Sequence, residues 1–367
     1  MSKNKKYKFT FIDLFAGIGG FHLSMESVGG KCVFASEIDK FARQTYEANY
    51  KQSSPEIFDN GNFNEDITDE NLKYEDIPEF DILCGGFPCQ PFSHAGLKKG
   101  FGDTRGTLFF NIQEIVHSKI KANQKDKSIS VPKILLLENV KGFKNHDKGN
   151  TFKTIKNVLD DLGYDMNAEV LNSKHFGVPQ NRERIFMVAW NRDLIKVEKF
   201  NFPFGIDNDG KVIFDKEKRE QLAKEVKVGD ILLKKEELEL LEKEANKTYT
   251  ISERLWAGHQ RRRVEHANKG NGFGFSSFNE NSPYTSTISA RYYKDGSEIL
   301  IEQNHIEGRP NRPRKLHPIE AARLQGYPID NGFIIPVSDN QAYKQFGNSV
   351  SVPVVKTIAQ EIIKQLL

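Results

Sequence analysis

The sequence predicts an α/β fold built on a parallel sheet, and two patterns carry this prediction. Residues 9–15 are β-prone, a glycine loop occupies 16–20, and a helical pattern then ends at Gly29-Gly30. A β-strand, a glycine loop and a helix in this order are typical of nucleotide-binding α/β folds. Residues 134–137 are entirely apolar, as in a strand that is covered on both faces of a sheet. The alternation of strand and helix breaks down after Trp190, so a second, smaller region is expected to follow.

Composition places the chain among ordinary globular proteins. Its 367 residues are enough for one large domain and a smaller one, and 38% of them are hydrophobic and 28% charged. The net charge of +3 does not by itself indicate nucleic acid. We find no signal peptide and no apolar run of membrane-spanning length, and the three cysteines are too few for a cysteine-based zinc site. We therefore expect a cytoplasmic protein with free thiols, no membrane association and no metal.

The first glycine loop favours a nucleoside cofactor. A second β-prone stretch, 31–36, ends at Glu37, roughly twenty residues past the loop, where a carboxylate can accept hydrogen bonds from ribose hydroxyls. Residues 41–49 have a helical pattern, and 53–64 are predicted to be a polar loop. Asp66 follows, and it suits either an adenine amino group or a simple turn.

A cysteine turn comes next in the chain. Residues 80–84 predict a buried strand, two glycines end it, and Pro88 fixes the backbone just before Cys89. This pattern presents a thiol at the mouth of a sheet, although most cysteines are buried small hydrophobes. The glycine-rich and charged loop at 98–105 is predicted to act as a lid.

Polar residues also flank two later strands, one at its end and one at its start. Glu138 follows the apolar run at 134–137 and lies where open α/β sheets place their ligands, although a strand-end cap would look the same. Arg182 and Arg184 are two residues apart at the start of a predicted strand, so both are expected to project from one side. Two guanidinium groups there suit a phosphate or a base carbonyl, and surface arginines are the alternative.

The region after Trp190 is irregular in pattern. Residues 216–247 are highly charged and predict a solvated insertion, whereas 256–315 predict short strands and long loops rich in side chains that can read a DNA groove. Basic clusters at 261–263 and 309–315 suit DNA phosphates or a solvated face. Helices are expected at 318–324, 341–345 and 353–367.

Five motifs in a fixed order resemble the DNA (cytosine-5) methyltransferase family. They are Asp13-Leu-Phe-Ala-Gly-Ile-Gly-Gly20, Gly86-Phe-Pro-Cys-Gln-Pro-Phe-Ser93, Glu138-Asn139-Val140, Gln180-Asn-Arg-Glu-Arg184 and Gln345-Phe-Gly-Asn-Ser-Val350. The resemblance implies a doubly wound, Rossmann-like methyltransferase sheet with a smaller target-recognition domain made mostly of β-structure and loops. We therefore expect a catalytic and cofactor-binding domain at 1–192, a recognition domain at 193–335 with its reading segment near 256–315, and a C-terminal segment at 336–367 that returns to the first domain.

The resemblance also implies the cofactor, S-adenosylmethionine, and the residues that would hold it. The first loop contacts it, with Phe15 against the adenine, Glu37 on the ribose and Asp66 on the adenine amino group. The full expected set is Phe15, Gly17, Gly19, Glu37, Ile38, Asp66, Ile67, Pro88, Leu108, Asn348, Ser349 and Val350. The chain departs from the family pattern at Ile38, where a tryptophan is common, and at Glu65, where a glycine is common.

The catalytic expectation is covalent catalysis on a cytosine that has been flipped out of the duplex. The Cys89 thiolate attacks C6, while Glu138, with a pKa raised by burial, hydrogen-bonds N3 and the amino group. Arg184 holds the cytosine O2, and Arg182 binds a phosphate or the loop around Cys89. The expected DNA contacts are Gln90, Ser93, Arg105, Arg261, Arg291, Tyr292 and Lys294.

Double-stranded DNA is the expected partner, within a short site of the CC-GG type. A cognate restriction endonuclease could act on the same site, and a monomer is the default expectation. Three other readings remain open: a tRNA cytosine-5 methyltransferase, a catalytically inactive DNA-binding homologue, and a nicotinamide-dependent Rossmann enzyme. The first usually lacks a long recognition segment, the second would not need Cys89 and Glu138, and the third lacks its third spaced glycine.

Overall fold

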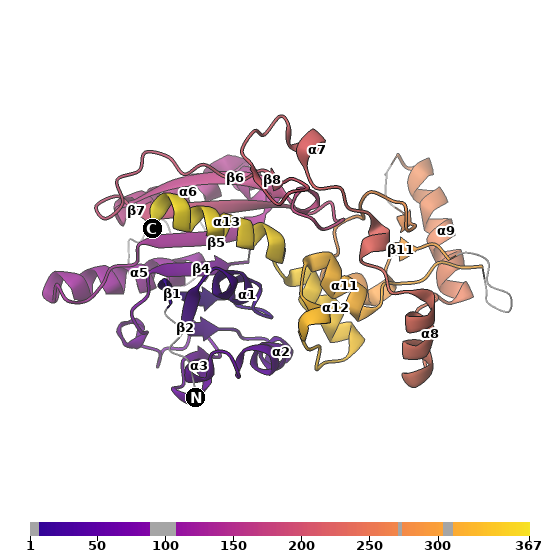
Figure 1. Cartoon of the computed structure of the whole chain (residues 1–367), viewed down its shortest axis with the longest axis horizontal. Helices are drawn as coiled ribbons and strands as arrows, with labels where there is room; N and C mark the ends of the chain where they lie inside the picture. The colour runs from indigo at the N-terminus through magenta and orange to yellow at the C-terminus, as the bar shows by residue number, and fades with distance from the viewer. Residues whose placement is uncertain (1–6, 89–107, 271–273, 304–310) are drawn as a thin grey trace. The chain divides into compact units, whose positions relative to one another are not determined.

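The computed structural model describes residues 7–88, 108–270, 274–303 and 311–367 (Figure 1). They form two compact units, and each unit is assembled from separate stretches of the chain. The sheet unit comprises Met1–Leu171, Glu183–Pro203 and Val354–Leu367, and the second unit comprises Asn172–Arg182 and Phe204–Pro353. The functional boundaries expected at 192 and 335 stay predictions.

A seven-stranded sheet forms the centre of the sheet unit. Its strand order is β3-β2-β1-β4-β5-β7-β6, and β1 pairs in parallel with β2 and β4, while β5 and β7 are antiparallel. The strand bounds are β1 Phe9–Leu14, β2 Gly30–Ser36, β3 Phe63–Asn64, β4 Ile82–Gly86, β5 Ile134–Val140, β6 Tyr164–Asn172 and β7 Glu183–Asn191. The chain reverses its direction of winding at β1 and β4, which lie side by side, and open α/β sheets generally bind ligands at the carboxyl ends of strands at such a point.

Both faces of this sheet are covered, as the apolar run in β5 predicts. Leu135 and Leu137 lie in one core cluster with residues of two helices, α5 and α6, and the alternate residues Ile134 and Leu136 are also fully buried. The α/β class is therefore confirmed. The helices of this unit are α1 Gly20–Ser27, α2 Lys40–Tyr50, α3 Pro55–Asp59, α5 Leu108–Lys125, α6 Asn150–Asp161 and most of α13 Val352–Leu366, with short 3-10 turns at Tyr74–Asp76 and Lys141–Gly149.

The stretch at 53–64 is more ordered than its polar composition predicts. It contains α3 and the edge strand β3, which pairs in parallel with β2. Pro55 occupies the first turn of α3, where its missing N–H costs nothing. Phe63 of β3 stacks on Tyr46 of α2, with ring centroids 4.7 Å apart. These aromatic contacts depend on distant residues, so local polarity did not reveal them.

The second unit combines helices with two small sheets. The strands β8 Gly205–Ile206 and β9 Val212–Ile213 pair with each other, as do β10 Ser277–Phe278 and β11 Leu300–Ile301. The helices are α7 Arg219–Leu222, α8 Lys235–Glu244, α9 Glu253–Asn268, α10 Tyr292–Asp295, α11 Pro318–Gln325 and α12 Asp339–Asn348, with 3-10 turns at Ser173–His175, Val228–Asp230 and Ile329–Asn331.

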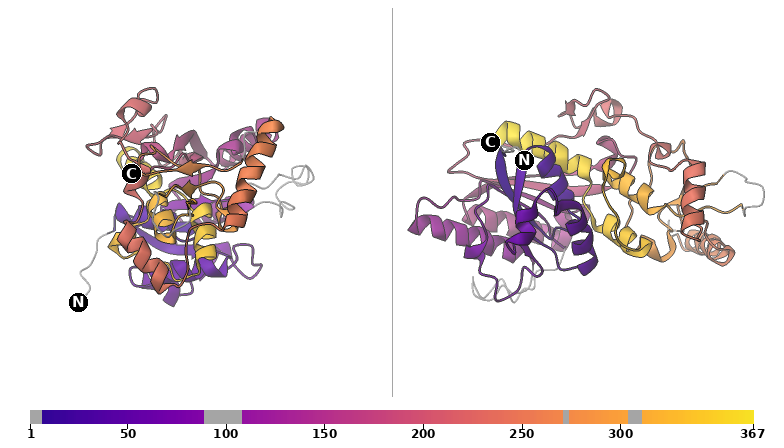
Figure 2. Two further views of the ribbon diagram at one scale, coloured as in Figure 1. Left: turned by 90° about the vertical axis from the view of Figure 1, so that its right-hand side faces the viewer. Right: turned by 60° about the horizontal axis from the view of Figure 1, so that its bottom comes forward.

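Helix α9 corrects the expectation of strands and loops from residue 256 onward. The Ser252 side chain accepts a hydrogen bond from the Leu255 N–H at 3.2 Å and so caps a helix of 16 residues. Most residues between 253 and 268 are good helix formers, and the glycine at 258 and the arginine run obscured this pattern. Figure 2 shows α9 at the surface of the second unit, consistent with its many exposed residues.

None of the described helices is both long and apolar enough to span a membrane.

Candidate active site

The glycine loop after β1 adopts the left-handed backbone that glycine tolerates best. Phe15, Gly17 and Gly19 have φ angles of 56°, 57° and 80°. The Gly17 N–H donates to Oε2 of Glu37 at 2.7 Å, which ties the loop to the end of β2. A Cβ atom built on Gly17 would meet no protein atom within 4 Å, so the loop faces open space at this point.

Glu37 is held by two backbone donors. Besides the Gly17 N–H, the Asp39 N–H donates to Oε1 of Glu37 at 2.7 Å. Burial raises the pKa of the Glu37 carboxyl, and hydrogen bonds from backbone N–H groups partly oppose this shift. The neighbouring Ile38 is 67% exposed, so its side chain is available to a ligand rather than to the core.

The other end of the loop is supported by residues that sequence reasoning missed. The Tyr50 hydroxyl donates to the Gly19 carbonyl at 2.8 Å, and the Tyr50 ring occupies the space that a side chain at residue 19 would need. His22 stacks on Tyr50 with ring centroids 4.1 Å apart and is fully buried. In the sequence Tyr50 directly follows the helical pattern at 41–49, and no local signal links it to Gly19.

Three further candidate cofactor residues contact one core cluster. Ile67 is buried in this cluster, and Phe15 and Leu108 pack against it. Asp66 lies beside Ile67, and its Oδ1 accepts hydrogen bonds from the N–H and hydroxyl of Thr68 at 2.8 and 2.7 Å. Asp66 therefore shapes a turn, and its predicted contact with adenine remains a prediction.

The strand that precedes the cysteine turn lies beside Glu138. Gly86 at the end of β4 is paired with Glu138 of β5, and the Asn139 amide donates to the Phe87 carbonyl at 2.9 Å. Pro88 is exposed. The candidates Cys89, Gln90, Ser93 and Arg105 lie outside the described residues.

Cys84, five residues before Cys89, belongs to the core. It is fully buried, and burial raises the pKa of its thiol well above the ordinary value. A thiol that resists ionisation is a poor nucleophile. This placement agrees with the buried strand expected at 80–84.

Glu138 and Arg184 form an ion pair across β5 and β7. Arg184 Nε lies 3.2 Å from Oε1 of Glu138, and a second nitrogen of Arg184 donates to the Glu183 carbonyl at 2.8 Å. Burial lowers the pKa of Arg184 and Glu138 opposes the shift, so the guanidinium stays charged at neutral pH. The pair sets a fixed cation beside a carboxylate at the carboxyl end of β5.

Arg182 has different partners from Arg184. It is 2% exposed, and its guanidinium donates to the carbonyls of Ile288, Gly347 and Ser349 in the second unit. Arg182 precedes β7, so the strand alternation that should place both arginines on one side does not apply to it. Backbone carbonyls already take up its guanidinium, and the expected contact of Arg182 with a phosphate or with the loop around Cys89 stays a prediction.

The last three cofactor candidates follow or end α12 in the second unit. Asn348 is the final residue of α12, and Ser349 and Val350 come directly after it. The hydroxyls of Tyr327 and Ser349 are hydrogen-bonded at 2.7 Å, and both residues are buried.

The candidate DNA contacts fall into two groups. Arg261, Arg291 and Lys294 are exposed and remain available to DNA. Tyr292 is fully buried. Its hydroxyl donates to the Ile299 carbonyl at 2.7 Å and accepts from the Leu316 N–H at 2.8 Å. Tyr292 therefore serves the core of the second unit, and we leave it out of the proposed DNA-contacting set.

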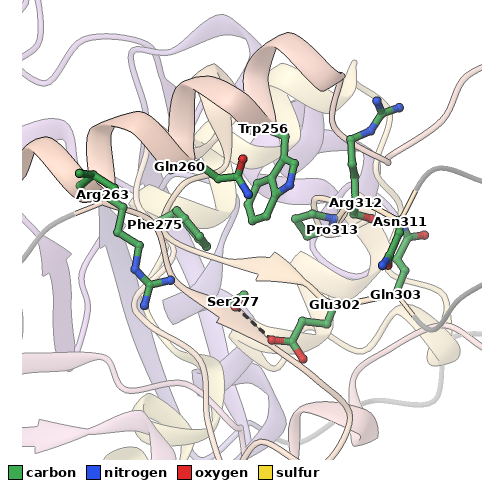
Figure 3. A pocket seen from close by; sticks show the side chains of 11 residues that line it. Trp256, Gln260, Arg263, Phe275, Ser277, Glu302, Gln303, Asn311, Arg312 and Pro313 are labelled. Carbon is green, nitrogen blue, oxygen red and sulfur yellow. Dashed lines mark hydrogen bonds between the residues drawn. The ribbon is translucent and has the colours of Figure 1, made fainter.

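A pocket of about 510 Å³ lies between α9 and the segments that carry β10 and β11 (Figure 3). Trp256 and Phe275 meet edge to face in it, with centroids 4.9 Å apart, and Arg263 stacks on Phe275. Gln260 also lines it, whereas Arg261 does not. Arginine, amide and aromatic groups of this kind suit nucleic acid. Arg263 belongs to the basic cluster expected at 261–263, whereas Gln260 was missed because α9 was not predicted.

Comparisons with known proteins show the family to which the chain belongs. A family model described as C-5 cytosine-specific DNA methylase matches residues 9–364. The type II methyltransferase M.SsoII of Shigella sonnei is 49% identical over 99% of this chain and 82% of its own length. M.NlaX of Neisseria lactamica, also a type II methyltransferase, is 48% identical over 96% of both chains.

A solved structure shares the fold at low sequence identity. The S. pombe Dnmt2 methyltransferase matches with a TM-score of 0.66 and 20% identity, over 97% of this chain and 99% of that one. Fold and site together define a methyltransferase of the α/β class. The chain belongs to the C-5 cytosine-specific DNA methylase family and is a DNA cytosine-5 methyltransferase.

Proposed function

We propose that this enzyme transfers a methyl group from S-adenosylmethionine to C5 of a flipped cytosine through a covalent adduct with Cys89. The observation that carries the proposal is the position of Glu138. It is paired with Gly86, three residues before Cys89 in the chain, and its carboxylate lies 3.2 Å from Arg184. An acid and a cation beside the start of the cysteine turn suit the recognition of a cytosine ring.

The glycine loop fits the cofactor. A side chain at Gly17 would enter open space, and Glu37 is held beside this space with a carboxylate able to accept more hydrogen bonds than its two backbone donors supply. Phe15, Gly17, Gly19, Ile38 and Glu37 would hold the nucleoside. When bound, S-adenosylmethionine supplies an electrophilic methyl group.

The chain's own residues activate the cytosine. The Cys89 thiolate forms a bond to C6, and the electron pair displaced from the C5–C6 double bond makes C5 nucleophilic. Glu138 donates to N3 and accepts from the amino group, which draws electron density from C6 and stabilises the adduct. Arg184 holds O2 and keeps Glu138 in place. After methylation a base removes the C5 proton and Cys89 leaves C6, which restores the ring.

Duplex DNA is the proposed substrate, in a short site of the CC-GG type. The relatives of high identity are type II methyltransferases by name, which supports a role in protecting bacterial DNA beside a cognate restriction endonuclease. The target base must leave the stack, because C6 is not open to a thiolate inside the duplex. Exposed Arg291 and Lys294 and the pocket lined by Arg263 provide contacts for DNA in the second unit.

One experiment tests the proposal. The enzyme is incubated with labelled S-adenosylmethionine and either plasmid DNA or tRNA, and modified cytosines are mapped by bisulfite sequencing. We expect label in plasmid DNA at one short sequence. Label in tRNA alone, or label in neither nucleic acid, would refute the proposal.

A further inference from the structure

The second unit contains a buried polar cluster centred on Arg182, and no step of the proposed mechanism uses it. The guanidinium donates to the Ile288 carbonyl at 3.1 Å, to the Gly347 carbonyl at 3.2 Å and to the Ser349 carbonyl at 2.6 Å. Charge-assisted hydrogen bonds to backbone carbonyls are strong when buried. Arg182 thus joins two stretches of chain that are far apart in the sequence.

The first stretch is 287–290, directly before the exposed Arg291. Gln180 supports it, because Oε1 of Gln180 accepts from the Ile288 N–H at 3.1 Å, and Gln180 is fully buried. The Thr287 hydroxyl also donates to the Asn181 carbonyl at 2.6 Å. Residues 180–182 therefore hold 287–288 through both backbone and side-chain contacts.

The second stretch is 347–349, at the end of α12. The backbone of Ser289 and Ala290 fills the space where a side chain at Gly347 would lie, so the two stretches pack directly on each other. The Ser349 hydroxyl is also hydrogen-bonded to the Tyr327 hydroxyl at 2.7 Å. A glycine is required at 347 because any Cβ would collide with the 289–290 backbone.

We propose that Arg182 is a positioning residue that sets the place of Ser349 and of the 287–290 segment at the same time. Ser349 belongs to the cofactor set expected from the sequence, and 287–290 leads into the proposed DNA contacts Arg291 and Lys294, so the inference rests on the proposed function. It assigns the two arginines of one motif to different tasks. Arg184 acts beside Glu138 on the cytosine. Arg182 holds the backbone of Ser349, for cofactor binding, and of 287–290, for DNA recognition.

Matched lysine variants separate these tasks. Lysine keeps the charge but cannot reproduce the planar fork that reaches three carbonyls. For Arg182→Lys we expect the KM for S-adenosylmethionine to rise roughly two- to tenfold and the base preference around the methylated cytosine to relax, with kcat on the preferred site within about threefold of wild type. For Arg184→Lys we expect the reverse, a fall in kcat with KM and base preference unchanged. Base preference is read by bisulfite sequencing of a randomised duplex library.

Two milder variants keep the test valid if Arg182→Lys does not fold, which thermal unfolding will show. Tyr327→Phe removes only the hydroxyl that contacts Ser349, and should raise the KM for S-adenosylmethionine without changing base preference. Thr287→Val removes only the hydroxyl that contacts Asn181, and should relax base preference without changing that KM.

The inference is overturned if a folded Arg182→Lys enzyme loses kcat alone, or keeps wild-type KM and base preference. It is also overturned if Tyr327→Phe and Thr287→Val both match wild type in both measurements. Direct titration of S-adenosylmethionine without DNA separates these outcomes from a failure of the proposed function. A wild-type enzyme that binds S-adenosylmethionine but methylates no DNA would refute the proposed function, whereas an effect of Tyr327→Phe on that titration would still support the positioning of Ser349.

Discussion

Arg184 Nε lies 3.2 Å from Oε1 of Glu138, and the two side chains come from the neighbouring antiparallel strands β7 and β5. Both side chains are largely buried, with 18% and 11% of their surface exposed. A carboxylate in such a place is costly unless a cation or hydrogen-bond donors accompany it. Arg184 therefore offsets the cost of burying Glu138, and the sheet holds the two groups side by side.

Replacing Glu138 by glutamine should reduce kcat by at least about 100-fold, because an amide cannot serve as the acid at N3. The substitution keeps the side-chain shape, so cofactor affinity and thermal stability should stay near wild type. Transfer of labelled methyl groups to plasmid DNA measures the effect. Glu183→Gln is the matched control, since Glu183 is the exposed partner of Lys141, and near-equal losses in both variants would contradict the role of Glu138.

Replacing Cys89 by serine should abolish methylation while leaving S-adenosylmethionine binding near normal. A serine hydroxyl is far less ionised than a thiol near neutral pH and does not form the bond to C6 at a useful rate. Methyl transfer and cofactor titration are measured on the same preparation. Cys84→Ser tests the buried thiol, and methylation by that variant in proportion to its folded fraction is expected. Activity retained by Cys89→Ser would rule out the covalent route.

Affinity for S-adenosylmethionine should fall as the pH is lowered through the pKa of Glu37. Ribose hydroxyls donate to the ionised carboxylate, so bound cofactor lowers the Glu37 pKa and binding releases a proton. The affinity for S-adenosylmethionine has its full value when the pH is above the Glu37 pKa of the free enzyme. It falls as the pH drops below that pKa. Because burial raises that pKa, the loss should begin at a higher pH than for an ordinary glutamate. Titration calorimetry at a series of pH values measures this affinity. The Glu37→Gln variant should bind S-adenosylmethionine more weakly, and its affinity should depend less on pH. A pH dependence equal to that of wild type would contradict the role of Glu37.

Alanine at Gly17 should mainly reduce cofactor affinity, whereas alanine at Gly19 should mainly reduce the stability of the fold. Both positions have positive φ, so each alanine costs about 1–2 kcal/mol of backbone strain. At Gly17 the added methyl group enters open space, so the protein should fold and lose cofactor affinity. At Gly19 it collides with the Tyr50 ring, so the free energy of unfolding should fall further. Chemical denaturation and cofactor titration distinguish the two, and equal stability losses would show that the Tyr50 contact is unimportant.

Much of the site could be predicted because its residues lie at strand ends with strong local patterns. The glycine loop follows β1, Glu37 follows β2, and Glu138 follows the apolar run at 134–137 within β5; the parallel pairing of β1 and β2 brings the first two together. The partners of buried polar groups could not be predicted in this way. Arg182 donates to carbonyls 106 to 167 residues further along the chain, and no local pattern encodes such a pairing.

The sequence by itself determined the α/β class, the family and the residue types that carry the chemistry, since hydrophobic periodicity and ordered motifs are local properties. Only the tertiary structure decided which side chains those residues meet. Tyr292 is buried in a core, the Tyr50 hydroxyl donates to the Gly19 carbonyl, and Arg182 and Arg184 have separate partners. The reason is physical: a strand or helix follows from its own residues, whereas packing and buried hydrogen bonds depend on which distant segments fill the neighbouring space.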